Sequence, residues 1–223
     1  GFDTAVISGA EQTIQKLWGL SDAMIGQTVA MALYGTVIGA LFGGFPADIL
    51  GRKKTLIWIS ILYFISAVGS ALAPEVYSLM FFRFIGGLGV GASSVVAPMY
   101  ISEIAPAHKR GQLTALFQFN IVVGILIAYL SNYFIGGAGD GNWRWMLGIE
   151  AFPALAFIIM IFFVPRSPRW LIVKRGLIDE AKHVLDIIDS STSDQQLKAI
   201  QDHKDGTKKV GFKEFFSGKF NLP

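Results

Sequence analysis

Residues 111–139 read GQLTALFQFNIVVGILIAYLSNYFIGGAG, a run of 29 positions without a charged side chain. A helix that crosses the hydrocarbon core of a bilayer needs roughly 20 mostly apolar residues, each adding about 1.5 Å of length. Further charge-free runs cover 23–47, 55–74, 84–102 and 151–165. The stretch therefore predicts a membrane-spanning helix, and its recurrence predicts a protein that crosses the bilayer several times.

The composition divides the chain into two parts. Of the 223 residues, 52% are hydrophobic and 16% are charged, whereas a soluble domain is typically about 25% charged. Residues 1–165 carry 16 of the charged side chains and residues 166–223 carry 19. We expect a transmembrane unit over 1–165 and a water-facing tail over 166–223. The composition excludes a disordered chain, a coiled coil and a disulfide scaffold, and the absence of Cys excludes thiol chemistry.

The charge-free runs, with their flanking residues, predict an all-α membrane protein with six apolar segments. We place these segments at about 2–15, 27–47, 56–73, 77–102, 113–134 and 145–164. The first is too short to cross a bilayer alone, and the sixth is long enough only if it includes Glu150. Because the chain begins at Gly1 without a Met and ends at Pro223, we expect a truncated first helix and a longer parent protein.

The distribution of Lys and Arg predicts the orientation in the membrane. Arg52, Lys53 and Lys54 follow the second segment, Lys109 and Arg110 follow the fourth, and the tail carries eleven more basic residues. These 16 of the 19 basic residues lie on one side, which the positive-inside rule makes cytoplasmic. This asymmetry explains the net charge of +3 without a nucleic-acid partner.

The tail is expected to form short amphipathic helices. Ser167 followed by Pro168 is a typical helix start, and Gly176 is a typical stop. Apolar residues then recur at helical spacing between 177 and 188. We find no nucleotide, metal or nucleophile motif there, and predict no cofactor or metal.

Three ionisable residues fall within the apolar segments: Asp3, Arg83 and Glu150. An unpaired charge at membrane depth costs at least ~2.5–3.5 kcal/mol, so such residues usually pair and usually function. Arg83 and Glu150 lie about 9 Å inside the outer ends of their segments at helical rise, and Asp3 lies deeper. One cation facing two carboxylates suits proton handling. The alternative is a structural ion pair that holds three helices together.

Gln118, in the fifth segment, is the other polar residue of interest. A Gln side chain both donates and accepts hydrogen bonds, which suits a hydroxyl-rich ligand. An interhelical hydrogen bond explains it equally well.

Seven motifs in order along the chain resemble those of the sugar porter family of the major facilitator superfamily, especially its bacterial xylose–proton symporters and glucose facilitators. The motifs are GFDTAVISG at 1–9, DILGRKK at 48–54, RFIGGLGVG at 83–91, PMYISEIAP at 98–106, KRG at 109–111, QFNIVVGILIAY at 118–129 and PRSPRWL at 165–171. The resemblance implies the N-terminal six-helix half of a twelve-helix transporter, built from inverted three-helix repeats. Its partner would be its own C-terminal half, absent from this chain.

The resemblance also implies roles for individual residues. Asp3, Arg83 and Glu150 match proton-coupling positions. Gln118 matches a sugar-binding Gln, and Thr4 and Ile121 match positions near the sugar. The cytoplasmic charge network that latches the two halves matches the following residues: Asp48, Arg52, Glu103, Arg110 and Arg169.

Three positions depart from the family pattern. Ile49 stands where the family has Arg, and Arg166 stands where it has Glu, which puts the strength of the latch in question. Ile125 matches glucose facilitators, whereas the xylose symporter has a second Gln there. The sugar therefore need not be xylose, and a pentose or a hexose remains possible.

The favoured function is sugar–proton symport by alternating access, with a monosaccharide and a proton as substrates. A facilitative sugar uniporter is the alternative, which Asp3 and Glu150 disfavour. A transporter-like sugar sensor is the third hypothesis; such proteins usually carry long cytoplasmic extensions, and because the tail here is about the length usual in the family, nothing favours sensing. A membrane enzyme is least favoured, since no catalytic constellation is present. The expected location is a bacterial cytoplasmic membrane.

Overall fold

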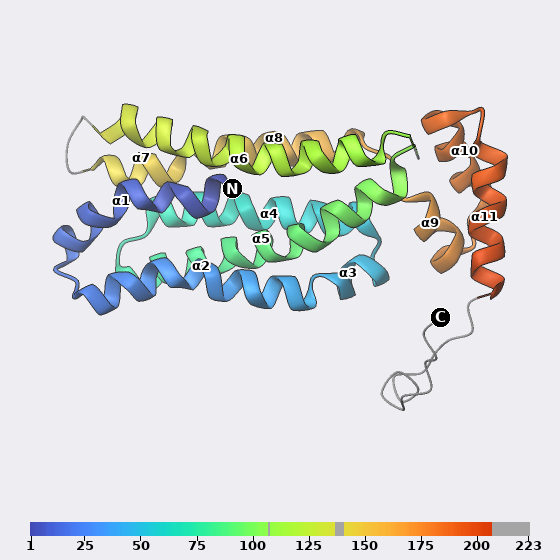
Figure 1. The fold of residues 1–223 in the computed structure, drawn as a ribbon. Helices are drawn as coiled ribbons and strands as arrows, with labels where there is room; N and C mark the ends of the chain where they lie inside the picture. Colours follow the sequence, from blue (N-terminus) through green and yellow to red (C-terminus); the bar gives the residue numbers. More distant parts are fainter. Residues whose placement is uncertain (107, 137–140, 207–223) are drawn as a thin grey trace, which may run out of the picture.

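The computed structural model describes residues 1–106, 108–136 and 141–206, so residues 207–223 of the expected tail lie outside the described residues. Helices account for the regular structure in these ranges (Figure 1). They are α1 Phe2–Trp18, α2 Asp22–Phe42, α3 Gly44–Ile49, α4 Arg52–Leu72, α5 Val76–Ile104, α6 Arg110–Ile135, α7 Asn142–Gly148, α8 Ala151–Phe163, α9 Pro168–Trp170, the π-helix η2 Leu171–Arg175, α10 Ile178–Asp189 and α11 Ser193–Gly206.

Five helical stretches are long and apolar enough to cross a membrane, in the part of the chain that is described. They are α2 with α3, α4, α5, α6, and α7 with α8. They confirm the five expected spans, each extended by a few residues. The short α1 runs beside them, and all lie along one direction in Figure 1.

Two of the spans are interrupted where a proline follows. Pro46 has no N–H to donate to the carbonyl of Phe42, and α2 gives way to α3 at Gly43. Pro153 likewise leaves the carbonyl of Ile149 without its usual helical donor, and α7 and α8 are separated at Ile149 and Glu150. The sequence interpretation treated both spans as continuous.

Glycines allow α2 and α5 to pack backbone against backbone. A Cβ at Gly35 or Gly39 on α2 would collide with the α5 backbone. A Cβ at Gly87 or Gly91 on α5 would collide with the α2 backbone. Small residues are the usual means of close helix contact in lipid, where apolar burial gives little net drive.

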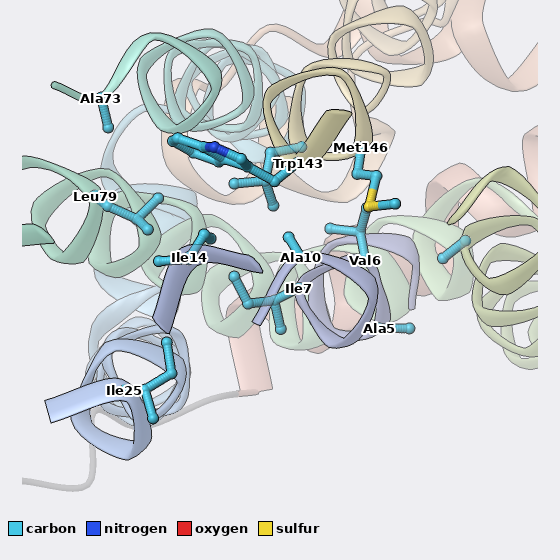
Figure 2. Close-up of a cluster of buried hydrophobic side chains, with 12 residues drawn as sticks. Ala5, Val6, Ile7, Ala10, Ile14, Ile25, Ala73, Leu79, Trp143 and Met146 are labelled. Atoms are coloured by element: carbon cyan, nitrogen blue, oxygen red, sulfur yellow. The ribbon is translucent and has the colours of Figure 1, made fainter. Parts of the chain in front are cut away.

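A cluster of buried apolar side chains holds α1 in place. Val6 and Ile14 of α1 pack with Leu79 of α5 and Trp143 of α7 (Figure 2). The Trp143 ring meets Trp18 edge to face, with centroids 5.4 Å apart. This packing fixes the face of α1 that turns toward α5, and with it the direction of Asp3.

The tail helices pack together at one end of the bundle, next to the α3–α4 and α5–α6 junctions (Figure 1). Trp170, Leu171 and Val184 belong to their shared core. Ser167 Oγ accepts a hydrogen bond from the Trp170 N–H at 3.1 Å, and Gly176 ends the segment at φ 69°. The expected start and stop are confirmed. The stretch between them differs, since Leu171–Arg175 has π-helical hydrogen bonding.

Candidate functional site

A buried ion pair joins α1 to α5 inside the bundle. Arg83 Nη1 lies 2.9 Å from Asp3 Oδ1, and both side chains are almost fully buried, at 2% and 5% exposure. The Arg83 Nη1 and Nη2 groups also donate to the backbone carbonyl of Asp3, each at 3.1 Å. The guanidinium is therefore fixed against one turn of α1 as well as against its carboxylate.

The hydrogen bonding of this pair is incomplete. Arg83 Nε and Asp3 Oδ2 are buried and have no hydrogen-bond partner among the described residues. An unpaired polar atom in a dry environment is costly, and breaking a buried ion pair is costlier still. Oδ2 is thus the carboxylate oxygen of Asp3 that Arg83 leaves unpaired.

Glu150 faces the same region from the break between α7 and α8. It lines a cavity of about 200 Å³ together with Asp3 and Phe157. It lies near enough to Asp3 and Arg83 for charge interactions with both. Arg83 pairs with Asp3, and no ion pair of Glu150 occurs among the described residues. The arrangement is one cation, one paired carboxylate and one nearby carboxylate.

The sequence interpretation missed a tyrosine that lines this cavity. Tyr63 on α4 is within hydrogen-bonding distance of Ser93 on α5, with 2.7 Å between the two hydroxyl oxygens. Neither residue belongs to a motif that the sequence singled out. Because the pairing depends on how α4 and α5 rotate against each other, no local pattern could have identified it.

The three residues expected near a sugar meet where α1 approaches α6. A Cβ on Gly1 would collide with the backbone of Ile121, so the first turn of α1 touches the middle of α6. Thr4 is one turn along α1 and exposed, Gln118 is one turn back along α6 and exposed, and Ile121 is half-buried. Gln118 has no hydrogen bond within the described residues, so the interhelical hydrogen bond that was its alternative explanation is not made here.

This surface of α6 has few neighbours in the part of the chain that the structure describes. Only 6% of its most apolar window is buried, against 28–44% for the other four spans. An amide exposed on so apolar a helix is unfavourable against lipid. The position of Gln118 therefore favours a face that meets water, ligand or another part of the protein.

A second network of charges lies at the tail end of the bundle. Arg52, at the start of α4, pairs with Asp48 at 2.9 Å and with Glu103 of α5 at 3.0 Å. Ser167 donates its hydroxyl to Oε2 of the same Glu103 carboxylate, which is also the oxygen 3.0 Å from Arg52 Nε. Trp170 Nε1 donates to the backbone carbonyl of Asp48 at 3.0 Å. The network thus binds α9 to the ends of α3, α4 and α5.

The other two expected members are not in this network. Arg169 is exposed and shares a cavity with Arg52 and Glu103, without an ion pair among the described residues. Arg110 begins α6 and is exposed, again without an ion pair in the described ranges. Three of the five residues expected in the latch are therefore in direct contact.

The chain resembles known proteins in family profile, in sequence and in fold. The profile of the sugar (and other) transporter family matches residues 1–222. The D-xylose transporter of Levilactobacillus brevis is 42% identical, over 100% of this chain and 49% of the relative. The glucose transport protein of Synechocystis is 41% identical over 92% of this chain and 47% of the relative, and the D-xylose-proton symporter of Escherichia coli K12 is 36% identical over 95% and 50%.

Solved structures give the same assignment. The major facilitator superfamily proton:xylose symporter XylE, bound to 6-bromo-6-deoxy-D-glucose, matches with a TM-score of 0.86 and 37% identity over 92% of this chain and 50% of XylE. Its inward open conformation matches with a TM-score of 0.82. The chain spans about half the length of these relatives and has the fold of the N-terminal half of such a transporter. It is an integral membrane protein, and it belongs to the sugar transporter family of the major facilitator superfamily.

Proposed function

We propose that the complete protein is a sugar–proton symporter that works by alternating access. The observation that carries the proposal is the buried Asp3–Arg83 pair beside Glu150. A charged group inside a membrane bundle is costly and is retained where it pairs or carries ions. A second carboxylate beside an already neutral pair adds a cost that proton binding would offset.

The coupling step is a competition between a proton and a guanidinium. While Asp3 is ionised, Arg83 neutralises it and holds α1 against α5. When Asp3 takes up a proton, its hold on Arg83 weakens and the guanidinium can turn toward Glu150. Because Glu150 lies at the Pro153 break, a pull on its side chain acts where the sixth span is least continuous. Loading with a proton would thus release one helix contact and form another.

Gln118, Thr4 and Ile121 are the proposed sugar-facing residues of this half. The exposed amide of Gln118 supports hydrogen bonding to hydroxyl groups, and half-buried Ile121 supports contact with the apolar face of a sugar ring. The opposite wall of the site would come from the C-terminal half. The sugar is a pentose or a hexose, in keeping with the xylose and glucose transporters among the relatives.

The charge network of Arg52, Asp48 and Glu103 is the proposed cytoplasmic latch, with Arg110 and Arg169 available to the other half. Residues 1–165 would be the transmembrane unit and 166–223 the cytoplasmic link to the C-terminal half. The basic ends of the spans and the tail would lie on the cytoplasmic side of a bacterial inner membrane, as the Lys and Arg distribution favours.

The test is sugar accumulation by the complete protein in liposomes. With the outside acidified, we expect labelled xylose or glucose to accumulate above its external concentration, and a protonophore to abolish the excess. Uptake that only equilibrates, with or without the pH gradient, would contradict symport and favour the facilitative uniporter. Absence of uptake of either sugar would contradict the proposed substrate class.

A further inference from the structure

A cavity of about 280 Å³ lies at the tail end of the bundle, next to the charge network of Arg52 and sharing Arg52, Ser167 and Trp170 with it. Its walls come from the start of α4, from the residues just before α9 and from the end of η2. Lys53 donates to the backbone carbonyl of Phe162 in α8 at 2.9 Å, so the cavity lies where α4 begins and α8 ends. It is therefore at the boundary between the membrane spans and the tail helices.

The cavity is strongly basic. Among the described residues, five cationic side chains line it and no carboxylate does. They are Arg52, Lys53, Lys54, Arg166 and Arg175. Such a concentration of one sign raises the local concentration of anions, most of all in a cleft with low-dielectric walls.

Carboxylates outside the cavity neutralise only part of this charge. Arg52 is engaged by the latch carboxylates, and Arg166 meets Glu180 at 3.3 Å in an exposed pair that is worth little. Within the described ranges, Lys53 bonds only to the backbone carbonyl of Phe162, and it lies near enough to Arg166 for mutual repulsion. Lys54 is exposed and has no hydrogen bond or ion pair within the described residues.

The remaining wall is aromatic. Trp170 is buried, with its ring against Gly51 and the Arg175 guanidinium 5.2 Å from the ring centroid. The ring excludes water from one side of the cavity and limits where Arg175 can lie. An anion in the cavity would therefore meet Arg175, which lies over the Trp170 ring, and Lys53, which bonds to the end of α8. Neither cation is free in solvent.

We propose that this cavity is a binding site for a phosphate-bearing anion. Guanidinium and ammonium groups form the short, charge-assisted hydrogen bonds that phosphate oxygens accept. The volume is slightly below the roughly 300–1,000 Å³ of usual small-molecule sites, which suits a phosphate with a small attached group. Two sources share this chemistry: a soluble phosphate compound and the headgroup of an anionic phospholipid, which basic pockets at membrane boundaries also attract.

The experiment has one arm for each source. The complete protein is placed in phosphatidylcholine nanodiscs, and its Tm is measured against inorganic phosphate, with chloride at matched ionic strength. In the second arm, phosphatidylglycerol replaces part of the phosphatidylcholine. A ligand that binds the folded state raises Tm with its concentration, so the titration yields an apparent dissociation constant. Lys54→Gln and Arg166→Gln remove cavity charges, and Lys198→Gln removes an exposed charge of the tail outside the cavity as the matched control.

We expect a rise in Tm with inorganic phosphate, with phosphatidylglycerol, or with both, and the responding arm identifies the source. Each cavity variant should weaken that response about tenfold, as the loss of a hydrogen bond to a charged group predicts, and Lys198→Gln should leave it unchanged. Absence of any response of the parent protein in both arms would overturn the proposal. So would an equal loss in Lys198→Gln and Lys54→Gln, which would reveal a general charge effect.

Discussion

Replacing Gly39 by Ala should open the contact between α2 and α5. A Cβ at this position would lie 2.9 Å from the Ala92 nitrogen, about 0.5 Å inside ordinary contact, and closer still to the Leu88 carbonyl oxygen. Both are backbone atoms of α5, so no side chain can turn away and a helix must shift. Overpacking of this kind costs typically about 1–3 kcal/mol. In a protein about twice the length of this chain the shift is about 1–2 °C per kcal/mol, so Tm should fall by about 1–6 °C.

Gly26→Ala is the matched control. Gly26 lies on the same helix and has nothing within 4 Å of its Cβ position. The control should be neutral, or more stable by up to about 1 kcal/mol, because Ala favours a helix over Gly. Both variants would be measured by thermal unfolding of the purified complete protein in detergent. Equal Tm values for the two would refute the close α2–α5 packing.

Four further results are expected. Residues 1–223 alone, reconstituted in liposomes, should show no saturable sugar uptake, because transporter sites of this kind lie between two halves; such uptake would contradict the reading of the chain as a half. Gln118→Ala in the complete protein should weaken sugar binding by about 1–3 kcal/mol, measured by calorimetry, and Gln112→Ala, also exposed on α6, should not. Glu103→Gln should speed hydrogen exchange at 168–175 about tenfold or more, since it weakens the contacts of Arg52 and Ser167 with residue 103. Unchanged exchange would contradict the inference that this charge network holds α9 against the bundle. Hydrogen bonds from the Ser191 and Thr192 hydroxyls lower the pKa of Asp189, so the stability that this turn contributes is present above the carboxyl's usual pKa and is lost as the pH falls through the lowered value; the protection of these amides from hydrogen exchange, measured relative to the intrinsic exchange rate at each pH, should fall on acidification, and identical protection profiles in Asp189→Asn would disprove the link.

The spans were predictable because a bilayer imposes simple requirements. Length and lack of charge suffice to locate a run such as 111–139, and helix α6 follows it closely. The interruptions before Pro46 and Pro153 could have been expected from the missing N–H groups. Which helix positions are buried was harder to predict, because Gly39 and Gly26 look alike in sequence and differ only in what faces them.

The site could be predicted in part. Depth along the helices placed Asp3 deeper than Arg83, and the cost of an unpaired charge nevertheless favoured a contact between them. Nothing along the chain indicated that Tyr63 lines the cavity or that Ser167 bonds to Glu103. These contacts depend on the rotation of packed helices about their axes, which residue spacing within one helix does not report. The roles assigned to these residues in transport stay predictions.

The measurement that tests the central claim most directly compares wild type with Asp3→Asn in gradient-driven uptake. With one proton per sugar, a gradient of about one pH unit permits about tenfold accumulation. Asn resembles the protonated carboxyl in shape and cannot release a proton. Because breaking a buried pair can lower folding yield, uptake is normalised to folded protein. We predict that Asp3→Asn loses accumulation and retains counterflow exchange, which needs no net proton movement. Accumulation by Asp3→Asn equal to that of wild type, per folded molecule, would contradict proton coupling through the Asp3–Arg83 pair and leave it as a structural contact.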